Sequence, residues 1–258
     1  MTESRSPGQA FADHFSAIAS AYAAARPTYP PALFRWLAGE APSRRSVWDC
    51  AAGSGQATLA LAELFDAVLA TDASAAQLAQ MPERPNVRRR ASPAEASGLP
   101  DASTDLVTVA QALHWLPLAP FWREVSRVLV DGGLVAAWCY GMQQVEHPEI
   151  DRVVQRFYHQ VVGPYWPPER RLVETGYATL ELPFEAVEAP AFEMAVDWSL
   201  SEFLAYVGTW SATGRYRVEH GADPIDSLGA ELARWWGDAS RRVRWPLSLR
   251  VGRSHRTV

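Results

Sequence analysis

Residues 46 to 56 read Ser46-Val47-Trp48-Asp49-Cys50-Ala51-Ala52-Gly53-Ser54-Gly55-Gln56. An apolar strand ends here in an acid, a turn of small residues with two glycines follows, and a helical run from Ala57 to Phe65 comes next. Proteins of the α/β class use this order of elements to present backbone N–H groups to a nucleotide-like ligand. The stretch therefore predicts a nucleoside-cofactor site at the carboxyl end of the strand.

A second acid supports this interpretation. Asp72 ends the next apolar run, Ala67 to Thr71, and lies 17 residues after Gly55. In the Rossmann pattern an acid about 20 residues beyond the glycines binds ribose hydroxyls. The alternative for Asp72 is a cap on the short helix that follows, for which Ser74 is also a plausible N-cap.

Composition narrows the class of protein. With 258 residues, 48% of them apolar, the chain can hold one sizeable α/β domain and a smaller appendage. A net charge of −5 argues against nucleic-acid binding, and we interpret the basic run Arg88 to Arg90 as a solvated strand end. Cys50 and Cys139 lie in predicted apolar strands, so we expect neither a disulfide nor a metal site.

The apolar pattern indicates neither a membrane span nor a secretory signal. No apolar run approaches the roughly 18 residues of a membrane span, and no secretory apolar region is evident. We therefore expect a cytoplasmic protein without a membrane partner, either a monomer or a homodimer.

Alternating strand and helix patterns organise the first half of the chain. Strands are expected at 67–72, 86–90, 105–110 and 134–139, and helices at 56–65, 74–80 and 120–129. Short connections between such units favour a parallel, doubly wound sheet. Later we expect helices at 149–162, 201–210 and 226–236, strands at 192–198 and 243–251, and an irregular segment to residue 190.

The ordered motifs resemble those of class I S-adenosylmethionine-dependent methyltransferases of the type 11 group. The cofactor motifs are matched by Val47-Trp48-Asp49-x-x-x-Gly53-Ser54-Gly55-Gln56, Asp72-Ala73-Ser74 and Pro93-Ala94-Glu95. The match continues through Asp105 to Trp115 and through Arg127-Val128-Leu129-x-x-Gly132-Gly133. This resemblance implies S-adenosylmethionine as cofactor and S-adenosylhomocysteine as product.

Within that fold the chain is similar to the small-molecule branch that includes trans-aconitate and cantharidin methyltransferases. The signs of this branch are Tyr22-x-x-x-Arg26-Pro27-x-Tyr29-Pro30, Gln111-Ala112-x-His114-Trp115, Thr209-Trp210-Ser211-Ala212 and Trp245-Pro246-Leu247. The resemblance covers residues 11–253 and implies a small-molecule acceptor.

We expect a Rossmann-like, seven-stranded, mostly parallel sheet with an antiparallel last strand and helical, aromatic cap segments. The expected organisation is a disordered tail at 1–10, N-terminal helices and the cofactor-binding core at 11–141, substrate-covering segments at 142–225, and a helix and strand completing the sheet at 226–258. All of these form one domain.

One position departs from the family pattern. The first motif usually has three glycines, and Ala51 stands at the first of them. Such a glycine permits an unusual backbone and a close ligand approach. An alanine methyl is tolerated there if φ stays negative, so we expect cofactor binding to be retained.

The resemblance assigns the cofactor-binding residues. Asp49 either meets the methionine end of the cofactor or accepts from the turn's own N–H groups, and Asp72 binds the ribose. The 93–95 motif flanks the adenine, although Glu95 alone also fits plain surface. The full cofactor set is Tyr22, Arg26, Asp49, Ala51, Gly53, Gly55, Gln56, Asp72, Ala73, Pro93, Ala94, Glu95, Gln111 and Ala112.

The acceptor is expected at the carboxyl end of the strand 105–110. His114 either orients an acceptor or acts as a general base, or else it packs under Trp115 and bonds a carbonyl. Arg26 suits a carboxylate of the cofactor or the substrate, or it stacks on the nearby prolines and Tyr29. The candidate pocket residues are Tyr29, Trp138, Tyr140, Trp166, Trp210, Tyr216 and Arg217, each of which also fits a core role.

Methyl transfer from a sulfonium is an in-line displacement that needs alignment and exclusion of water. A carboxylate acceptor needs no base, whereas a phenol or ring nitrogen can use His114. Two alternatives to a methyltransferase stay open. Asp72 also suits an NAD(P)-dependent oxidoreductase, although Thr58 stands where its fingerprint requires a third glycine, and Ala51 suits a non-catalytic cofactor-binding module.

Overall fold

The computed structural model describes residues 27–255, and this part of the chain forms two compact units. The larger unit contains residues 28–143 and 169–194 and the chain from Trp245 onward. The smaller unit contains residues 144–168 and 195–244. The predicted N-terminal tail and the helical pattern at 11–22 lie outside the described residues, as do Tyr22 and Arg26.

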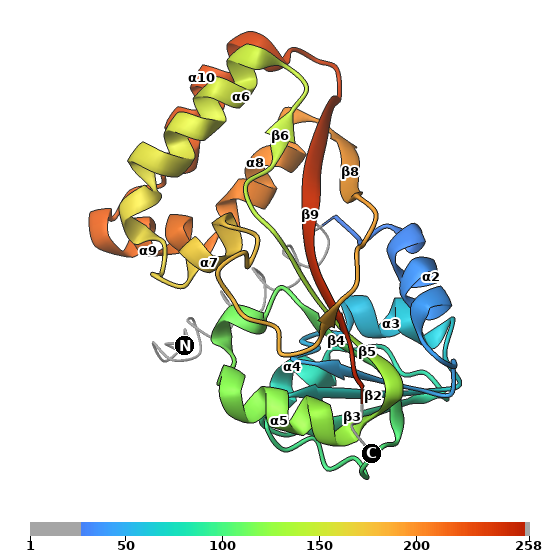
Figure 1. The fold of residues 1–258 in the computed structure, drawn as a ribbon. Helices are drawn as coiled ribbons and strands as arrows, with labels where there is room; N and C mark the ends of the chain where they lie inside the picture. Colours follow the sequence, from blue (N-terminus) through green and yellow to red (C-terminus); the bar gives the residue numbers. More distant parts are fainter. Residues whose placement is uncertain (1–26, 256–258) are drawn as a thin grey trace, which may run out of the picture. The chain divides into compact units, whose positions relative to one another are not determined.

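A mostly parallel sheet forms the larger unit, with the strand order β3-β2-β1-β4-β5-β9 (Figure 1). Its first five strands are parallel, and β9 runs antiparallel to β5 from Leu134↔Arg253 to Tyr140↔Leu247. The strand bounds are β1 (Ser46–Cys50), β2 (Ala67–Asp72), β3 (Val87–Ala91), β4 (Thr104–Ala110), β5 (Leu129–Tyr140) and β9 (Arg241–Arg253).

The strand order reverses at β1, which has β2 on one side and β4 on the other. In open α/β sheets the ligand crevice lies outside the carboxyl ends of the strands at this reversal. Cys50 ends β1, Asp72 ends β2 and Ala110 ends β4. The topology therefore brings the predicted cofactor motifs to one edge of the sheet.

The expected α/β class, the parallel sheet and the antiparallel last strand are confirmed. Among residues 27–255 the sheet has nine strands rather than seven, because the short strands β6 (Gln144–Val145) and β7 (Glu185–Ala186) and the strand β8 (Phe192–Trp198) also pair with β9. Strands of two residues leave no alternation of apolar and polar side chains from which a sequence could predict them.

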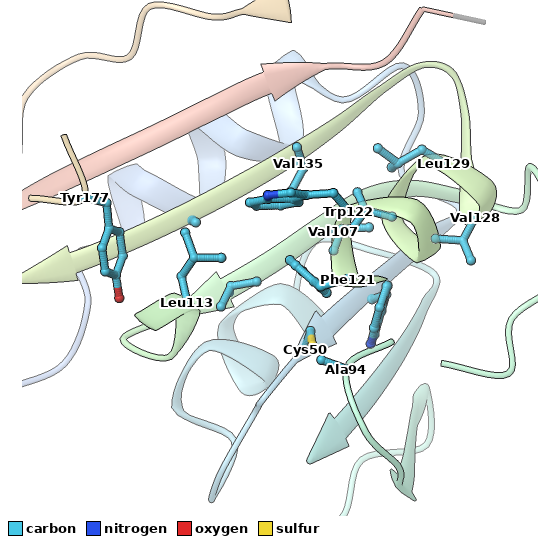
Figure 2. Packing of buried hydrophobic residues seen from close by; sticks show 14 of the residues in the cluster. Cys50, Ala94, Val107, Leu113, Phe121, Trp122, Val128, Leu129, Val135 and Tyr177 are labelled. Carbon is cyan, nitrogen blue, oxygen red and sulfur yellow. The ribbon is translucent and has the colours of Figure 1, made fainter. Parts of the chain in front are cut away.

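Helices of the larger unit follow the apolar spacing of the sequence. They are α2 (Pro31–Glu40), α3 (Gln56–Ala62), α4 (Ala75–Ala79), η1 (Leu113–Trp115), α5 (Leu118–Val128) and α7 (Arg170–Glu174). Helix α5 buries Phe121, Val125 and Val128 at helical spacing. Figure 2 shows Phe121 in the buried cluster that includes Val107 and Val135 from the sheet. Burial of such a side chain contributes about 2 kcal/mol.

The smaller unit is mainly helical. Its helices are α6 (Pro148–Arg156), the π-helical turn η2 (Phe157–Val161), η3 (Gly163–Tyr165), α8 (Leu200–Gly208), α9 (Ser211–His220) and α10 (Pro224–Trp236). Helices α6 and α10 lie side by side (Figure 1). A capping box formed by Ser199 and Glu202 begins α8. The expected helices near 149–162, 201–210 and 226–236 are confirmed, whereas α7 and α9 were not predicted.

Candidate functional site

The turn between β1 and α3 has an unusual backbone. Ala51, Gly53 and Gly55 all have positive φ values, of 56°, 56° and 91°. The backbone N–H of Ala52 donates to the carbonyl of Thr71 at 2.9 Å, which holds the turn against β2. A Cβ on Gly55 would lie 2.5 Å from Cγ of Met81, whereas a Cβ on Gly53 would have no heavy atom within 4 Å. Gly55 is therefore needed for packing, and Gly53 faces open space.

The expectation of a negative φ at Ala51 is wrong. Its φ of 56° lies in the left-handed region, because the hydrogen bond from Ala52 to Thr71 and the tight turn behind it fix the path of the chain. An L-residue there costs roughly 1–2 kcal/mol relative to the right-handed region. The alanine thus keeps the shape that a glycine would give this turn, at a cost in stability.

Replacing Ala51 by glycine should stabilise the protein. Relief of the left-handed strain exceeds the extra unfolded-state freedom of glycine, so we expect a gain of about 0.5–1 kcal/mol for Ala51→Gly. Urea unfolding followed by circular dichroism measures it. Ala52→Gly is the matched control, because Ala52 has no positive φ, and it should lose stability. A loss for both variants would contradict the strain at residue 51.

Asp49 is an interior residue. Its carboxylate is 0% exposed and accepts hydrogen bonds from the hydroxyls of Thr58 at 2.6 Å and Thr108 at 2.8 Å. Burial raises its pKa to about 6, although the hydrogen bonds from both threonines lower it. Asp49 therefore joins β1 to α3 and β4 through two threonine hydroxyls, and its complete burial suits a structural role.

Asp72 lies where β2 meets this turn. Its Oδ2 accepts from the backbone N–H of Gly53 at 2.9 Å and its Oδ1 from that of Ser74 at 2.8 Å. The N-cap of α4 is Ser74, whose side chain accepts from Gln77, so Asp72 is not the cap. A carboxylate has about four acceptor positions, and these two hydrogen bonds leave others for a ligand. The half-buried acid is thus held in place by the glycine turn itself.

The segment after β3 is a tight turn. The backbone N–H of Ser92 donates to the carbonyl of Asp72 at 3.0 Å, and that of Ala96 to the carbonyl of Pro93 at 3.2 Å. Pro93 and Glu95 are exposed, while Ala94 belongs to the buried cluster (Figure 2). This turn lies at the edge of the sheet where Asp72 ends β2. Ala73, the residue after Asp72, is also exposed.

Gln111 follows β4 with a positive φ of 55°. Its side chain pairs with the backbone of Tyr140, since Nε2 donates to the carbonyl at 3.1 Å and Oε1 accepts from the N–H at 3.2 Å. Its own N–H donates to the carbonyl of Trp138. The amide therefore joins the ends of β4 and β5, and backbone strain of this kind clusters at functional sites. Ala112, next in the chain, is half-buried.

His114 and Trp115 form a short helical turn at this edge. Trp115 is 57% exposed, and its ring lies 4.7 Å from that of His114 between centroids. Nδ1 of His114 lies 2.8 Å from the hydroxyl oxygen of Tyr177, a residue that sequence reasoning missed. Burial and the positive charge of Arg170 lower the pKa of His114 to about 4. The imidazole is therefore neutral at physiological pH.

Three predicted pocket residues of the larger unit pack in its core. Trp138 is 0% exposed, and its ring meets Tyr29 and Phe34 edge-on at 5.5 and 6.1 Å. Tyr29 and Tyr140 are also buried. For these three residues the structure favours the core role that the sequence left open.

The other predicted pocket residues belong to the smaller unit. Trp166 and Trp210 pack with Tyr158, with ring centroids 5.1 to 5.7 Å apart. The guanidinium of Arg217 donates to the carbonyl of Gly208 and pairs with Asp223 at 2.9 Å. Tyr216 packs on Tyr165 and His220. Arg217 thus binds a carbonyl and a carboxylate of the protein itself, which is the structural role that the sequence left open for it.

Comparison with known proteins identifies the family. A profile described as "Methyltransferase domain" matches residues 48–137, which run from β1 into β5. A protein of Dictyostelium discoideum, provisionally named a methyltransferase, is 33% identical over 227 residues, which cover 87% of this chain and 86% of the relative. The chain belongs to the methyltransferase family.

Two further comparisons agree. A solved structure from Anaeromyxobacter dehalogenans, provisionally described as a type II methyltransferase, has 46% identity and a TM-score of 0.85, and the match covers 90% of this chain and 99% of that one. A Saccharomyces cerevisiae protein named as a probable S-adenosylmethionine-dependent methyltransferase is 30% identical over 142 residues, covering 51% of this chain and 49% of its own. The NAD(P)-dependent oxidoreductase hypothesis is accordingly set aside.

This methyltransferase uses S-adenosylmethionine, which supplies an electrophilic methyl group when bound. Its residues fit that group, because Gly53 faces open space and the carboxylate of Asp72 retains acceptor positions beside it. Within the described residues of the methyltransferase, no helix has the length and apolarity that a membrane span requires.

Proposed function

We propose that the methyltransferase transfers the methyl group to a carboxylate oxygen of a small molecule. The observation that supports this acceptor is the setting of His114, whose Nδ1 lies 2.8 Å from the hydroxyl oxygen of Tyr177 and whose pKa burial lowers to about 4. An imidazole of that pKa is a weak base and removes a phenolic proton poorly at pH 7. A carboxylate is already ionised at that pH, so its methylation requires no base.

The transfer balances without a proton. A lone pair of the carboxylate oxygen forms the new O–C bond, the C–S bond breaks, and the sulfur keeps the electron pair. The sulfonium and the carboxylate both lose their charge, and a methyl ester and a thioether result. The chain has only to align the two groups and to exclude water.

We assign the residue roles from the family motifs, and the geometry around Gly53 supports them. We assign Asp72 to the ribose hydroxyls and Gly53 to the close approach of the cofactor. Pro93, Ala94 and Glu95 are assigned to the adenine, and Asp49 to support of the turn. Gln111 acts through its pairing with Tyr140, which fixes the loop that carries His114 and Trp115.

The exposed ring of Trp115 suits a planar acceptor. This supports the similarity of the chain to the branch that contains the trans-aconitate and cantharidin methyltransferases. Tyr22, Arg26 and Trp210 stay predictions that rest only on the sequence motifs of that branch. The net charge of −5 supports an acceptor other than nucleic acid, and the two buried free cysteines suit a reducing, cytoplasmic compartment. A monomer or homodimer suffices for this chemistry.

A matched acceptor panel tests the proposal. Aromatic and aliphatic carboxylates, their amides and the corresponding phenols are incubated with the enzyme and methyl-labelled S-adenosylmethionine, and esters are identified by mass spectrometry. We expect label in carboxylates and none in amides. Transfer to phenols alone would overturn the acceptor class, and the absence of any transfer from a cofactor-bound enzyme would favour a non-catalytic module.

The rate should be insensitive to pH where an ordinary histidine titrates. Because the pKa of His114 is lowered from 6.5 to about 4, the neutral form persists above about pH 5, and kcat/KM should show no step between pH 6 and 8. The stability that neutral His114 contributes is present above pH 6.5 and lost as pH falls through about 4. A profile with an inflection near 6.5 that His114→Gln abolishes would contradict this.

A further inference from the structure

Tyr177 is held in an unusual place for a bulky residue. It has a positive φ of 61°, directly after Gly176, and its side chain is 0% exposed. Its backbone N–H donates to the carbonyl of Leu172 at 2.8 Å, and its carbonyl accepts from the guanidinium of Arg250 at 2.8 Å. A non-glycine residue with this backbone is strained, so the surrounding structure must determine its position.

The hydroxyl of Tyr177 has a defined set of neighbours. Nδ1 of His114 lies 2.8 Å away. Burial raises the pKa of the tyrosine, and the nearby backbone N–H groups of His114 and Leu113 oppose that rise. Figure 2 shows Leu113 and Tyr177 in the same buried cluster. The thiol of Cys139 is also near, but it donates to the carbonyl of Val173 at 3.7 Å.

These neighbours determine which group donates in the hydrogen bond between the hydroxyl of Tyr177 and Nδ1 of His114. The backbone N–H groups of Leu113 and His114 are donors only, so they cannot take the hydrogen of the hydroxyl, which needs an acceptor. The thiol sulfur of Cys139 is a weak acceptor, whereas an unprotonated imidazole nitrogen is a strong one. The tyrosine hydroxyl therefore donates to Nδ1, and the proton of the neutral imidazole resides on Nε2.

We propose that Tyr177 is a positioning residue that holds His114 in the neutral Nε2–H tautomer, so that His114 donates a hydrogen bond to the acceptor molecule instead of removing its proton. The part of this proposal that concerns the acceptor rests on the proposed function. A donor at Nε2 suits the carboxylate oxygen that does not take the methyl group. Methylation would then occur on its partner oxygen, with the plane of the carboxylate fixed against Trp115.

The charged groups around His114 agree with a neutral ring. Burial lowers the pKa of His114 most, Arg170 lowers it further, and Glu169 raises it by a smaller amount. Burial raises the pKa of Tyr177 above its ordinary value, and that of Cys139 to about 12, so both keep their protons. Arg170 and Glu169 are therefore the charged groups that act on the imidazole near pH 7, and the effect of Arg170 is the larger.

Nitrogen NMR of the imidazole tests the tautomer without any substrate. In the full-length protein labelled with ¹⁵N-histidine, we expect His114 to show an unprotonated Nδ1 and a protonated Nε2 from pH 6 to 8. Tyr177→Phe should give a mixture of tautomers. Tyr165→Phe is the matched control, because it removes a hydroxyl 2.6 Å from Nε2 of His220 and should leave the His114 signals unchanged.

Kinetics test the donor role. Tyr177→Phe should lower kcat about tenfold and leave the Kd for S-adenosylmethionine within about twofold, as expected for lost positioning. His114→Gln, which keeps an N–H donor but cannot act as a base, should retain more activity than His114→Ala. Equal losses in the two His114 variants would overturn the donor role.

The outcomes separate this inference from the proposed function. A protonated Nδ1 in the wild-type protein would overturn the role of Tyr177 even if carboxylates are methylated, and it needs no variant that must fold. Conversely, an acceptor panel without carboxylate products would overturn the acceptor class while the NMR result for His114 stands on its own.

Discussion

Asp72→Ala should weaken the binding of S-adenosylmethionine at least tenfold, which corresponds to about 1.4 kcal/mol. Two losses add in this variant. The carboxylate that we assign to the ribose hydroxyls disappears, and the backbone N–H groups of Gly53 and Ser74 lose the oxygens that they now bind at 2.9 and 2.8 Å. Hydrogen bonds to a charged acceptor contribute roughly 1.5–3 kcal/mol each, so the glycine turn itself should loosen.

Isothermal titration calorimetry measures the affinity, and Asp72→Asn separates the two losses. The amide keeps one acceptor oxygen and the size of the side chain, so its affinity should lie between those of the wild type and Asp72→Ala. Asp66→Ala is the control, because Asp66 is an exposed acid just before the opposite end of the same strand. Unchanged affinity in Asp72→Ala would show that the ribose assignment is wrong.

Local spacing explains why so much of the fold was predictable. The run from Ser46 to Gln56 and the acid at 72 are signals within one βαβ unit, and the apolar spacing of α5 repeats within a single helix. Such signals depend on neighbours in the chain, so a sequence displays them. Helix α9 lacks them: Gly214 lies in its interior, and only Ala212 and Thr213 are buried.

The parts that escaped prediction depend on distant contacts. Tyr177 meets His114 across 63 positions, and its segment showed no regular pattern from which that meeting could be inferred. The φ of Ala51 follows from a hydrogen bond to Thr71 in the next strand. The Gly-Tyr pair after the stretch Arg170–Glu174 was the one available signal for Tyr177, because glycine often marks a left-handed helix end.

Gly53→Ala should also lower the affinity for S-adenosylmethionine at least tenfold, for a reason that differs from that of Asp72. A Cβ at residue 53 would meet no heavy atom of the protein within 4 Å, so the added methyl group enters the open space that we assign to the cofactor. The left-handed φ of 56° adds a net stability cost of about 0.5–1 kcal/mol, the reverse of the gain expected for Ala51→Gly. Gly132→Ala is the matched control, since Gly132 has a φ of 71° and the same open surroundings. It should lose similar stability and keep its affinity.

Exchanging the two residues separates strain from obstruction. The double variant Ala51→Gly/Gly53→Ala carries one left-handed alanine in the turn, as the wild type does, and only moves its methyl group from residue 51 to residue 53. Its free energy of unfolding should therefore lie within about 0.5 kcal/mol of the wild type, because the costs offset each other. The affinity should stay as low as in Gly53→Ala if the methyl group occupies cofactor space. Recovery of wild-type affinity in the double variant would instead mean that strain of the turn, and not its surface, governs cofactor binding.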